Sequence, residues 1–356
     1  MQIHRELVER RKARPDENSL GFGRIFTDHM LVARYEESKG WYDARIVPYG
    51  PLQLDPAAAV LHYGQELFEG LKAYRGKDGV IRLFRPEENC RRMADGARRL
   101  CMPPISEEDM LQMIMELVAV EKDWVPHAEG TALYIRPTLV ATEPFLGVRP
   151  SKSYLFFVIL SPVGAYYAEG FDPVKIWVEP KYSRAARGGL GAVKAGANYA
   201  ASLLASEKAK EMGYAQVLWL DAAEHRWLEE VGTMNLFLRI GDEVVTPELG
   251  GSILPGITRD SVLRLLRSWK VPVTERAISI DEVREAHARG DLREVFGTGT
   301  AAVISPVKEL FYKGEAMVVG DGTMGELSRR LYDTITGIQY GTVPDTFGWT
   351  RTVTGD

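Results

Sequence analysis

The sequence predicts an α+β protein of two domains, and three observations support this prediction. The chain has 356 residues, whereas one domain usually has about 100–200. Segments whose apolar residues recur at helical spacing alternate with short apolar runs that are typical of buried strands. A stretch rich in Gly, Tyr and Pro, residues 164–173, separates the two halves. We therefore expect a smaller N-terminal domain over 1–165, an interdomain loop over 166–175 and a larger domain over 176–356.

Helix signals in the N-terminal half come from spacing and from residues that begin helices. Val60, Tyr63, Leu67 and Leu71 recur at helical spacing. Proline is typical of a first helical turn, and a serine followed three residues later by an acidic residue resembles a capping box. The predicted elements are a surface arm (1–20), strands (31–48), a helix (57–74), a strand (81–84), helices from Pro86 to Leu100 and from Ser106 to Trp124, and strands at 132–140 and 154–160.

The C-terminal half is expected to contain more strands. Thr258 is the expected N-cap of one helix, because a threonine hydroxyl can accept a hydrogen bond from a free backbone N–H group. The predicted elements are strands at 174–179, 216–221, 234–240 and 294–296, two strands within 304–320 joined at Lys313–Gly314, and helices at 199–212, 258–269 and 324–338.

Composition excludes several classes of protein. The formal charge is 44 − 49 = −5, which argues against nucleic-acid binding. Two cysteines cannot form a secreted disulfide framework or a four-thiolate zinc site, and the histidines show no metal-ligand spacing. The most apolar run, 154–160, is far shorter than the ~20 residues of a membrane helix. With no signal-peptide core at the N-terminus, we expect a cytoplasmic protein without a bound metal.

Lys194 is the first candidate for chemistry. It lies in the Gly/Ala-rich segment RAARGGLGAVKAGANYAAS, where small residues would let a flat ligand approach the backbone. Burial would lower the pKa of its amine and make the amine a nucleophile toward carbonyl groups. On this segment alone, a solvated surface lysine is the favoured interpretation.

Two Gly/Thr segments are candidates for anion binding. Gly256, Ile257 and Thr258 begin a predicted helix, whose free N–H groups suit a phosphate, although a simple cap is the favoured interpretation of this segment alone. Residues 297–302 fit the dinucleotide fingerprint G-x-G-x-x-A, which would indicate an NAD-dependent dehydrogenase. The residues that follow disfavour the helix that this fingerprint requires. We therefore expect Thr300 to offer its hydroxyl to an anion.

Glu230 and Arg92 complete the candidate set. Glu230 enters an apolar strand in LEEVGTMNLF, where a buried carboxylate needs a cationic or proton-donating partner. Arg92 lies on a predicted helix and either faces a phosphate or is solvated. An amine, a carboxylate and two anion-binding segments together match the needs of pyridoxal 5'-phosphate (PLP).

The chain resembles the branched-chain amino-acid aminotransferases, whose PLP fold is type IV. The resemblance runs from about residue 22 to residue 307 and is strongest in FGRIFTDHM, LHYGQELFEGLKAYRG, IRLFRPEENCRRM, LYIRPTL, GGLGAVKAGANYAAS, LEEVGTMNLF, LPGITRD and EVFGTGTAAVISPV. It implies a two-domain α+β fold with a small N-terminal α/β domain and a larger C-terminal domain that has a β-barrel-like core.

The resemblance also implies residue roles. Lys194 matches the lysine that carries PLP and acts in catalysis. The matching cofactor-binding residues are Arg92, Tyr199, Glu230, Thr233, Ile257, Thr258 and Thr300. The matching substrate-binding residues are Phe22, Tyr63, Tyr134, Arg136, Tyr166, Thr233, Thr300 and Ala301.

The implied activity is reversible transfer of the amino group of L-leucine, L-isoleucine or L-valine to 2-oxoglutarate, by a homodimer. A D-amino-acid aminotransferase or an aminodeoxychorismate lyase of the same fold is the nearest alternative. A PLP-binding protein without catalytic activity is another, and an NAD-dependent dehydrogenase is a distant one.

Overall fold

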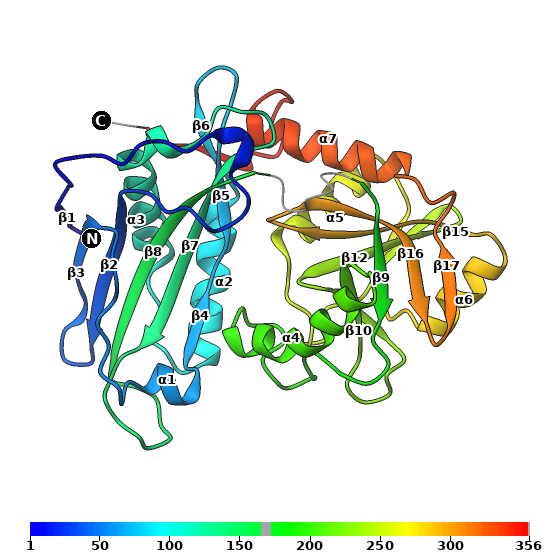
Figure 1. Cartoon of the computed structure of the whole chain (residues 1–356), viewed down its shortest axis with the longest axis horizontal. Helices are drawn as coiled ribbons and strands as arrows, with labels where there is room; N and C mark the ends of the chain where they lie inside the picture. The colour runs from blue at the N-terminus through cyan, green and yellow to red at the C-terminus, as the bar shows by residue number, and fades with distance from the viewer. Residues whose placement is uncertain (165–171, 355–356) are drawn as a thin grey trace. The chain divides into compact units, whose positions relative to one another are not determined.

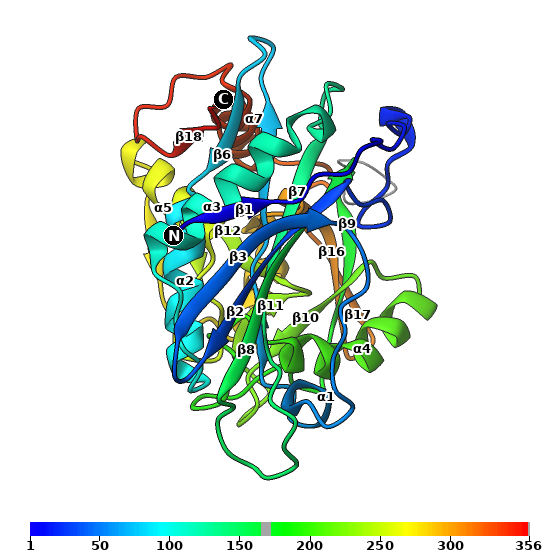
Figure 2. The same ribbon diagram turned by 90° about the vertical axis from the view of Figure 1, so that its left-hand side faces the viewer.

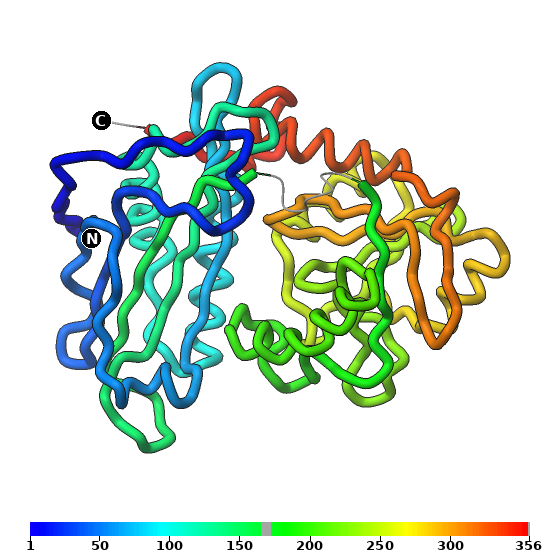
Figure 3. Tube along the Cα trace, in the orientation of Figure 1, coloured from blue at the N-terminus to red at the C-terminus, as the bar shows by residue number. Residues whose placement is uncertain are grey.

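The computed structural model describes residues 1–164 and 172–354. The chain divides into two compact units, which are described separately below, and its path can be followed in Figure 3. The first unit consists of Met1–Tyr166, Val193–Gly196 and Gly337–Asp356, and the second of Tyr167–Ala192 and Ala197–Thr336. The predicted boundaries place residues 193–196 and 337–356 in the second domain, whereas both segments group with the first unit here.

The first unit contains a nine-stranded sheet in the order β1-β3-β2-β8-β7-β5-β6-β18, with β4 paired to β7. Two helices, α2 (Pro86–Arg99) and α3 (Glu107–Val120), lie against one face of it (Figures 1 and 2). The strands are β1 (Ile3–Arg5), β2 (His29–Glu36), β3 (Gly40–Pro48), β4 (Glu66–Phe68), β5 (Leu71–Arg75), β6 (Ile81–Phe84), β7 (Ala132–Ala141), β8 (Ser153–Val163) and β18 (Thr350–Thr352). Leu31, Met113 and Phe156 are fully buried in its core.

Both helices begin as the sequence predicts. Pro86 occupies the first turn of α2, and the Ser106 hydroxyl accepts a hydrogen bond from the Asp109 backbone N–H at 3.0 Å at the start of α3. The second helix ends earlier than the predicted end at Trp124. Helix α3 ends at Val120, and a 3-10 turn over Lys122–Trp124 follows it.

The predicted helix over 57–74 is wrong. Only α1 (Ala59–Tyr63) is helical, and Gly64 ends it in the left-handed conformation with φ 57°. The chain then extends into β4 and β5, which pair with β7. Leu67 and Leu71 are buried as strand residues. A four-residue spacing places side chains on one side of a helix, but it also places them on one face of a strand, so the pattern could not separate the two.

The second unit is built on a closed barrel of six strands. The barrel closes because β11 pairs with both β10 and β12 at the ends of the order β11-β10-β9-β16-β15-β12. Its strands are β9 (Val174–Val178), β10 (Gln216–Leu220), β11 (Leu228–Val231), β12 (Met234–Ile240), β15 (Leu292–Gly299) and β16 (Val303–Tyr312); β13 (Glu243–Thr246), β14 (Val273–Glu275) and β17 (Glu315–Val318) extend the sheet. The helices are α4 (Gly196–Glu211), α5 (Ile257–Ser268), α6 (Ile280–Ala288) and α7 (Glu326–Tyr340).

The predicted barrel-like core is therefore confirmed, and so is the hairpin at Lys313–Gly314 between β16 and β17. Because a strand follows residues 297–302, the structure contradicts a dinucleotide-binding turn there. Across the described residues, none of the helices is both long enough and apolar enough to cross a membrane.

Two stacked phenylalanine rings lie in the wall of the barrel and contribute to its stability. Phe237 and Phe296 lie directly opposite each other on β12 and β15, with ring centroids 5.3 Å apart and planes at 4°, and both are fully buried. Truncating one ring would leave a cavity that the rigid strands cannot close.

We expect Phe296→Ala to lower the free energy of unfolding by about 3–5 kcal/mol in urea titration. Val318→Ala is the control, because Val318 is 46% exposed on β17, and it should change stability by less than about 0.5 kcal/mol. Equal unfolding midpoints for the two variants would contradict this account.

Candidate active site

Lys194 lies in the first unit, in the segment that precedes α4. The Phe68 backbone N–H donates to the Lys194 carbonyl at 3.0 Å, which fixes this segment beside β4. The Lys194 amine lies 5.0 Å from the centre of the Phe68 ring. Burial, followed by the positive charge of Arg92, lowers the pKa of Lys194 to about 8. A substantial fraction of the Lys194 amine is therefore neutral near physiological pH, which its sequence context could only suggest.

Glu69 and Arg92 form a bidentate ion pair next to this amine. Arg92 Nε donates to Glu69 Oε1 at 2.7 Å, and Arg92 Nη2 donates to Oε2 at 2.8 Å. Asn89 donates to the same carboxylate at 2.7 Å. Burial alone would raise the pKa of Glu69, but the charge and hydrogen bonds of Arg92 lower it. The pair acts on Lys194 in opposite senses, since Glu69 favours the ammonium form and Arg92 disfavours it.

Three predicted substrate residues lie close together in the same unit, namely Phe22, Tyr134 and Arg136. The Phe22 and Tyr134 rings meet edge to face at 5.0 Å. Arg136 donates from Nη2 to the Tyr134 hydroxyl at 2.9 Å and lies over the Phe68 ring at 4.6 Å. Among the described residues, buried Arg136 Nε has no hydrogen-bond partner. Gly70 has to be glycine here, because a Cβ would lie 2.1 Å from the Tyr134 hydroxyl.

Of the two other predicted tyrosines, Tyr63 does not join this group. Tyr63 is 44% exposed at the end of α1 and donates its hydroxyl to the Leu146 carbonyl. Tyr166 lies outside the described residues. Lys72 is a second buried lysine that sequence reasoning missed, and burial lowers its pKa to about 8 as well.

Glu230 lies in the second unit on β11 and is buried, as the strand context predicts. Its carboxylate forms an ion pair with Arg184, which also donates to the Ser252 carbonyl at 2.7 Å. The Asn235 amide donates to Glu230 Oε1 at 3.2 Å. Arg184 and Asn235 were not predicted. The only signal for Arg184 in the sequence is a charged side chain in a glycine-rich loop, and the only signal for Asn235 is a polar side chain in an apolar strand.

The neighbouring Glu229 has different surroundings. Its carboxyl accepts a hydrogen bond from the Ser252 hydroxyl, and burial raises its pKa. It lines a cavity of about 430 Å³ together with Trp227 and Ile253. Glu230 instead lines a separate, smaller cavity. The structure thus separates two glutamates that the motif LEEV presents as equivalents.

The smaller cavity collects other predicted cofactor residues. Tyr199 from α4 and Thr233 from the β11–β12 turn line it beside Glu230. The N-terminus of α5 is held near this carboxylate by Asn235, which also donates to the Leu254 carbonyl at 2.9 Å. The residues that line the cavity are Arg184, Asn198, Tyr199, Ser202, Glu230, Thr233 and Leu254.

Helix α5 begins with Gly256 as its N-cap and has no side-chain cap, so the predicted capping role of Thr258 is wrong. A Cβ at Gly256 would lie 1.9 Å from Asn235 Oδ1, and this close approach excludes the usual capping residues. Thr258 lies buried in the first turn beside Ile257. A helix N-terminus with a threonine hydroxyl in its first turn is a type of site that suits an anion.

Thr300 and Ala301 lie in the turn between β15 and β16, as predicted. Gly297 lets β15 pack against Met234, since a Cβ there would meet the Met234 side chain at 2.9 Å. Val303, directly after the turn, has φ 61°, a strained conformation for a β-branched residue. The buried Thr298 hydroxyl has no hydrogen-bond partner within the described part of the chain.

In residues 1–164 and 172–354, no group of three or more His, Cys, Asp or Glu side chains could hold a metal ion. The cysteine thiols are free, and burial raises the pKa of Cys90.

Comparison with known proteins gives consistent results. Residues 66–310 match the family "Amino-transferase class IV". The chain is 57% identical over 351 residues to "Branched-chain-amino-acid aminotransferase 2" of Bacillus subtilis, covering 99% of this chain and 97% of that protein. The fold matches a branched-chain amino acid aminotransferase from Escherichia coli with TM-score 0.76 and 27% identity, covering 92% of this chain and 99% of that one. It also matches a second branched-chain amino acid aminotransferase, from T.th., complexed with N-(5'-phosphopyridoxyl)-L-glutamate, with TM-score 0.73, 27% identity and coverage of 91% and 98%.

We expect Lys194 in the cofactor-free protein to react with acetic anhydride in its neutral form, with a midpoint near its pKa of about 8. Peptide mapping across a pH series resolves Lys194 from Lys72. In Glu69→Gln the midpoint should move to lower pH, because the negative charge that favours the ammonium form is removed. Exposed Lys181 is the internal reference. A pH response of Lys194 that matches Lys181 would contradict the lowered pKa.

Proposed function

Because the chain belongs to the class IV aminotransferases, and among them to the branched-chain-amino-acid aminotransferases, we propose that it uses PLP carried on Lys194. It transaminates branched-chain amino acids. The amino group of leucine, isoleucine or valine passes to 2-oxoglutarate, which becomes glutamate. The observation that carries the proposal for Lys194 is its buried amine, whose pKa is lowered to about 8. A homodimeric assembly and a cytoplasmic location complete the proposal.

The residues present fit PLP. Lys194 offers a partly neutral amine, which suits attack on an aldehyde. Glu230 offers a buried carboxylate for a pyridine nitrogen. The first turn of α5 and the Thr298 hydroxyl, which has no partner among the described residues, offer donors for a phosphate. When bound, PLP supplies a carbonyl that takes up the amino group and a ring that takes up electrons from the substrate Cα.

The chain's own residues hold this group and move protons. The phosphate is held by Ile257, Thr258, Thr300 and Arg92. For Arg92, this role requires that its guanidinium bind the phosphate and the Glu69 carboxylate at the same time. Tyr199 donates a hydrogen bond to the ring oxygen, while Glu230 keeps a proton on the ring nitrogen. With PLP bound, the Lys194 amine would act as general base toward the proton on the substrate Cα and as general acid toward the former aldehyde carbon of PLP. The Thr233 hydroxyl lies beside the bound substrate.

The substrate pocket combines apolar and cationic groups. Phe22 and Tyr134 bury the aliphatic side chain, at roughly 25 cal/mol per Å² of apolar surface. Arg136, whose buried Nε has no partner within the described residues, binds a substrate carboxylate. The backbone of Thr300 and Ala301 assists there, and Tyr63 and Tyr166 belong to the same proposed pocket. An aromatic wall beside one cation suits both a branched aliphatic chain and an acidic one.

Removing the Lys194 amine tests the proposal directly. We expect Lys194→Ala to fold and to lose at least about 1000-fold in kcat with leucine and 2-oxoglutarate. Lys210→Ala, on the exposed side of α4, is the control. Borohydride reduction of the wild-type protein followed by peptide mapping should place the cofactor on Lys194 and not on Lys72. Near wild-type turnover in Lys194→Ala would rule out the assigned role.

The two adjacent glutamates provide a matched pair. We expect Glu230→Gln to retain PLP on dialysis and to lower kcat by about 100-fold, because the ring nitrogen loses its acidic partner. Glu229→Gln should keep kcat within about threefold, since its carboxyl contacts Ser252 instead. Reversed effects would exchange the roles of the two residues. Assays with D-alanine and aminodeoxychorismate separate this activity from the alternatives of the same fold.

A further inference from the structure

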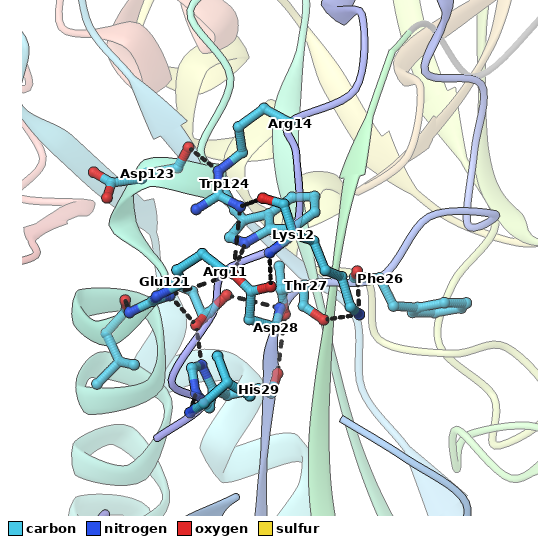
Figure 4. Close-up of polar contacts among 12 residues, drawn as sticks. Arg11, Lys12, Arg14, Phe26, Thr27, Asp28, His29, Glu121, Asp123 and Trp124 are labelled. Atoms are coloured by element: carbon cyan, nitrogen blue, oxygen red, sulfur yellow. Dashed lines mark hydrogen bonds and ion pairs between the residues drawn. The ribbon is translucent and has the colours of Figure 1, made fainter. Parts of the chain in front are cut away.

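The N-terminal arm, residues 6–27, is attached to the first unit by a buried anchor of Asp28, His29 and Glu121 (Figure 4). All three side chains are at most 2% exposed. The arm reaches them from outside the sheet, and its contacts join residues that are far apart in the sequence. None of these groups has a role in the proposed chemistry, so their burial requires a separate explanation.

His29 is held by partners on both sides of its ring. The Val8 backbone N–H donates to His29 Nε2 at 2.9 Å, so Nε2 must accept and carry no proton. Nδ1 therefore carries the proton and donates to Glu121 Oε1 at 2.5 Å. The histidine is thus a neutral connector between the backbone of the arm and the end of α3.

The positive charges of the arm balance the two buried carboxylates (Figure 4). Arg11 donates to Glu121 Oε1 at 2.7 Å, and Arg14 donates to Asp28 Oδ2 at 3.3 Å. Asp28 also accepts from the Lys12 backbone N–H at 2.8 Å and from Trp124 Nε1 at 2.8 Å. If the arm left, these carboxylates would lose most of their compensation while staying largely buried, which is strongly unfavourable.

Beyond the anchor, the arm passes the proposed substrate pocket. Glu17 accepts hydrogen bonds from the backbone N–H groups of His127 and Ala128 at 2.8 and 2.7 Å. Near the far end, the Thr27 N–H donates to the Leu160 carbonyl at 3.1 Å. Phe22 lies between these attachments and meets Tyr134.

The backbone on either side of Phe22 has little intrinsic preference for one conformation. Gly21 and Gly23 flank it with φ 62° and 69°, a region that glycine adopts without strain but does not specify. The position of the Phe22 ring therefore depends on the attachments of this segment. These are the two at its ends and, next to the ring, the hydrogen bond from the Gly164 N–H to the Gly21 carbonyl at 2.9 Å.

We propose that His29 is a positioning residue for substrate binding, which anchors the arm so that Phe22 stays against Tyr134. The proposal rests on the proposed pocket role of Phe22. His29 acts through the arm and contacts no reacting group. Its loss should therefore weaken the binding of apolar side chains and leave the chemical step intact.

The holoenzyme and five variants test this proposal. In His29→Ala, the KM for leucine should rise about tenfold with kcat within about twofold. The KM for 2-aminobutyrate, whose shorter chain reaches less of the wall, should change less. Trypsin should cut faster after Arg11 and Lys12, as measured from fragment masses. His29→Gln, whose Oε1 can accept from Val8, should restore part of both properties. Arg5→Ala, at an exposed ion pair at the end of β1 just before the arm, is the control and should match the wild type.

The possible outcomes separate the anchor from the pocket. Faster cleavage with an unchanged KM, or no change in either, would overturn the positioning role. Phe22→Ala should raise the KM while the arm stays protected from trypsin; an unchanged KM there would remove Phe22 from the pocket and leave the anchor itself intact. If His29→Ala does not fold, Arg11→Ala removes a partly exposed partner of Glu121. It should give smaller changes in the same direction in the KM and in trypsin cleavage after Lys12, whereas wild-type behaviour in both would overturn the proposal.

Discussion

A buried carboxylate needs a partner, and this constraint shapes every functional region of the protein. Glu69 has Arg92, Glu230 has Arg184, and Glu121 has Arg11 and His29. Each pair joins elements that are distant in sequence. The first lies next to Lys194 and influences its pKa in addition to burial, the second holds a carboxylate in a small cavity, and the third attaches the arm. Charge compensation thus connects the stability of each region to its chemistry.

Much of the fold could be predicted from local patterns. Proline at the start of α2, serine before α3 and the apolar runs of the barrel each depend on nearby residues only. The failure over 57–74 has a physical reason: Leu67 and Leu71 satisfy a helical and an extended pattern equally, and pairing with β7 decides between them. The return of residues 337–356 to the first unit depends on the pairing of β18 with β6, which no local signal specifies.

The candidate site was predictable in its residue types and only partly in its pairings. Lys194 and Glu230 carry local signals, a small-residue loop around one and an apolar strand around the other, but only the combination of several segments indicated a role for them. Arg184, Asn235 and Glu69 escaped prediction, since each matters through a partner far along the chain. The same holds for His29, which lies within a recognised motif although its contacts come from Val8 and Glu121.

The two ends of the chain lie at opposite edges of one sheet. Strand β1 forms one edge and β18 the other. Strand β18 is therefore synthesised long after the other strands of the sheet that it completes. A nascent chain on the ribosome exposes the open edge of β6 until residues 350–352 emerge. Synthesis of the whole barrel falls within this interval. During that interval the edge of β6 is open to pairing with other chains, which is the hazard of an unpaired strand, and β18 removes it by covering the edge.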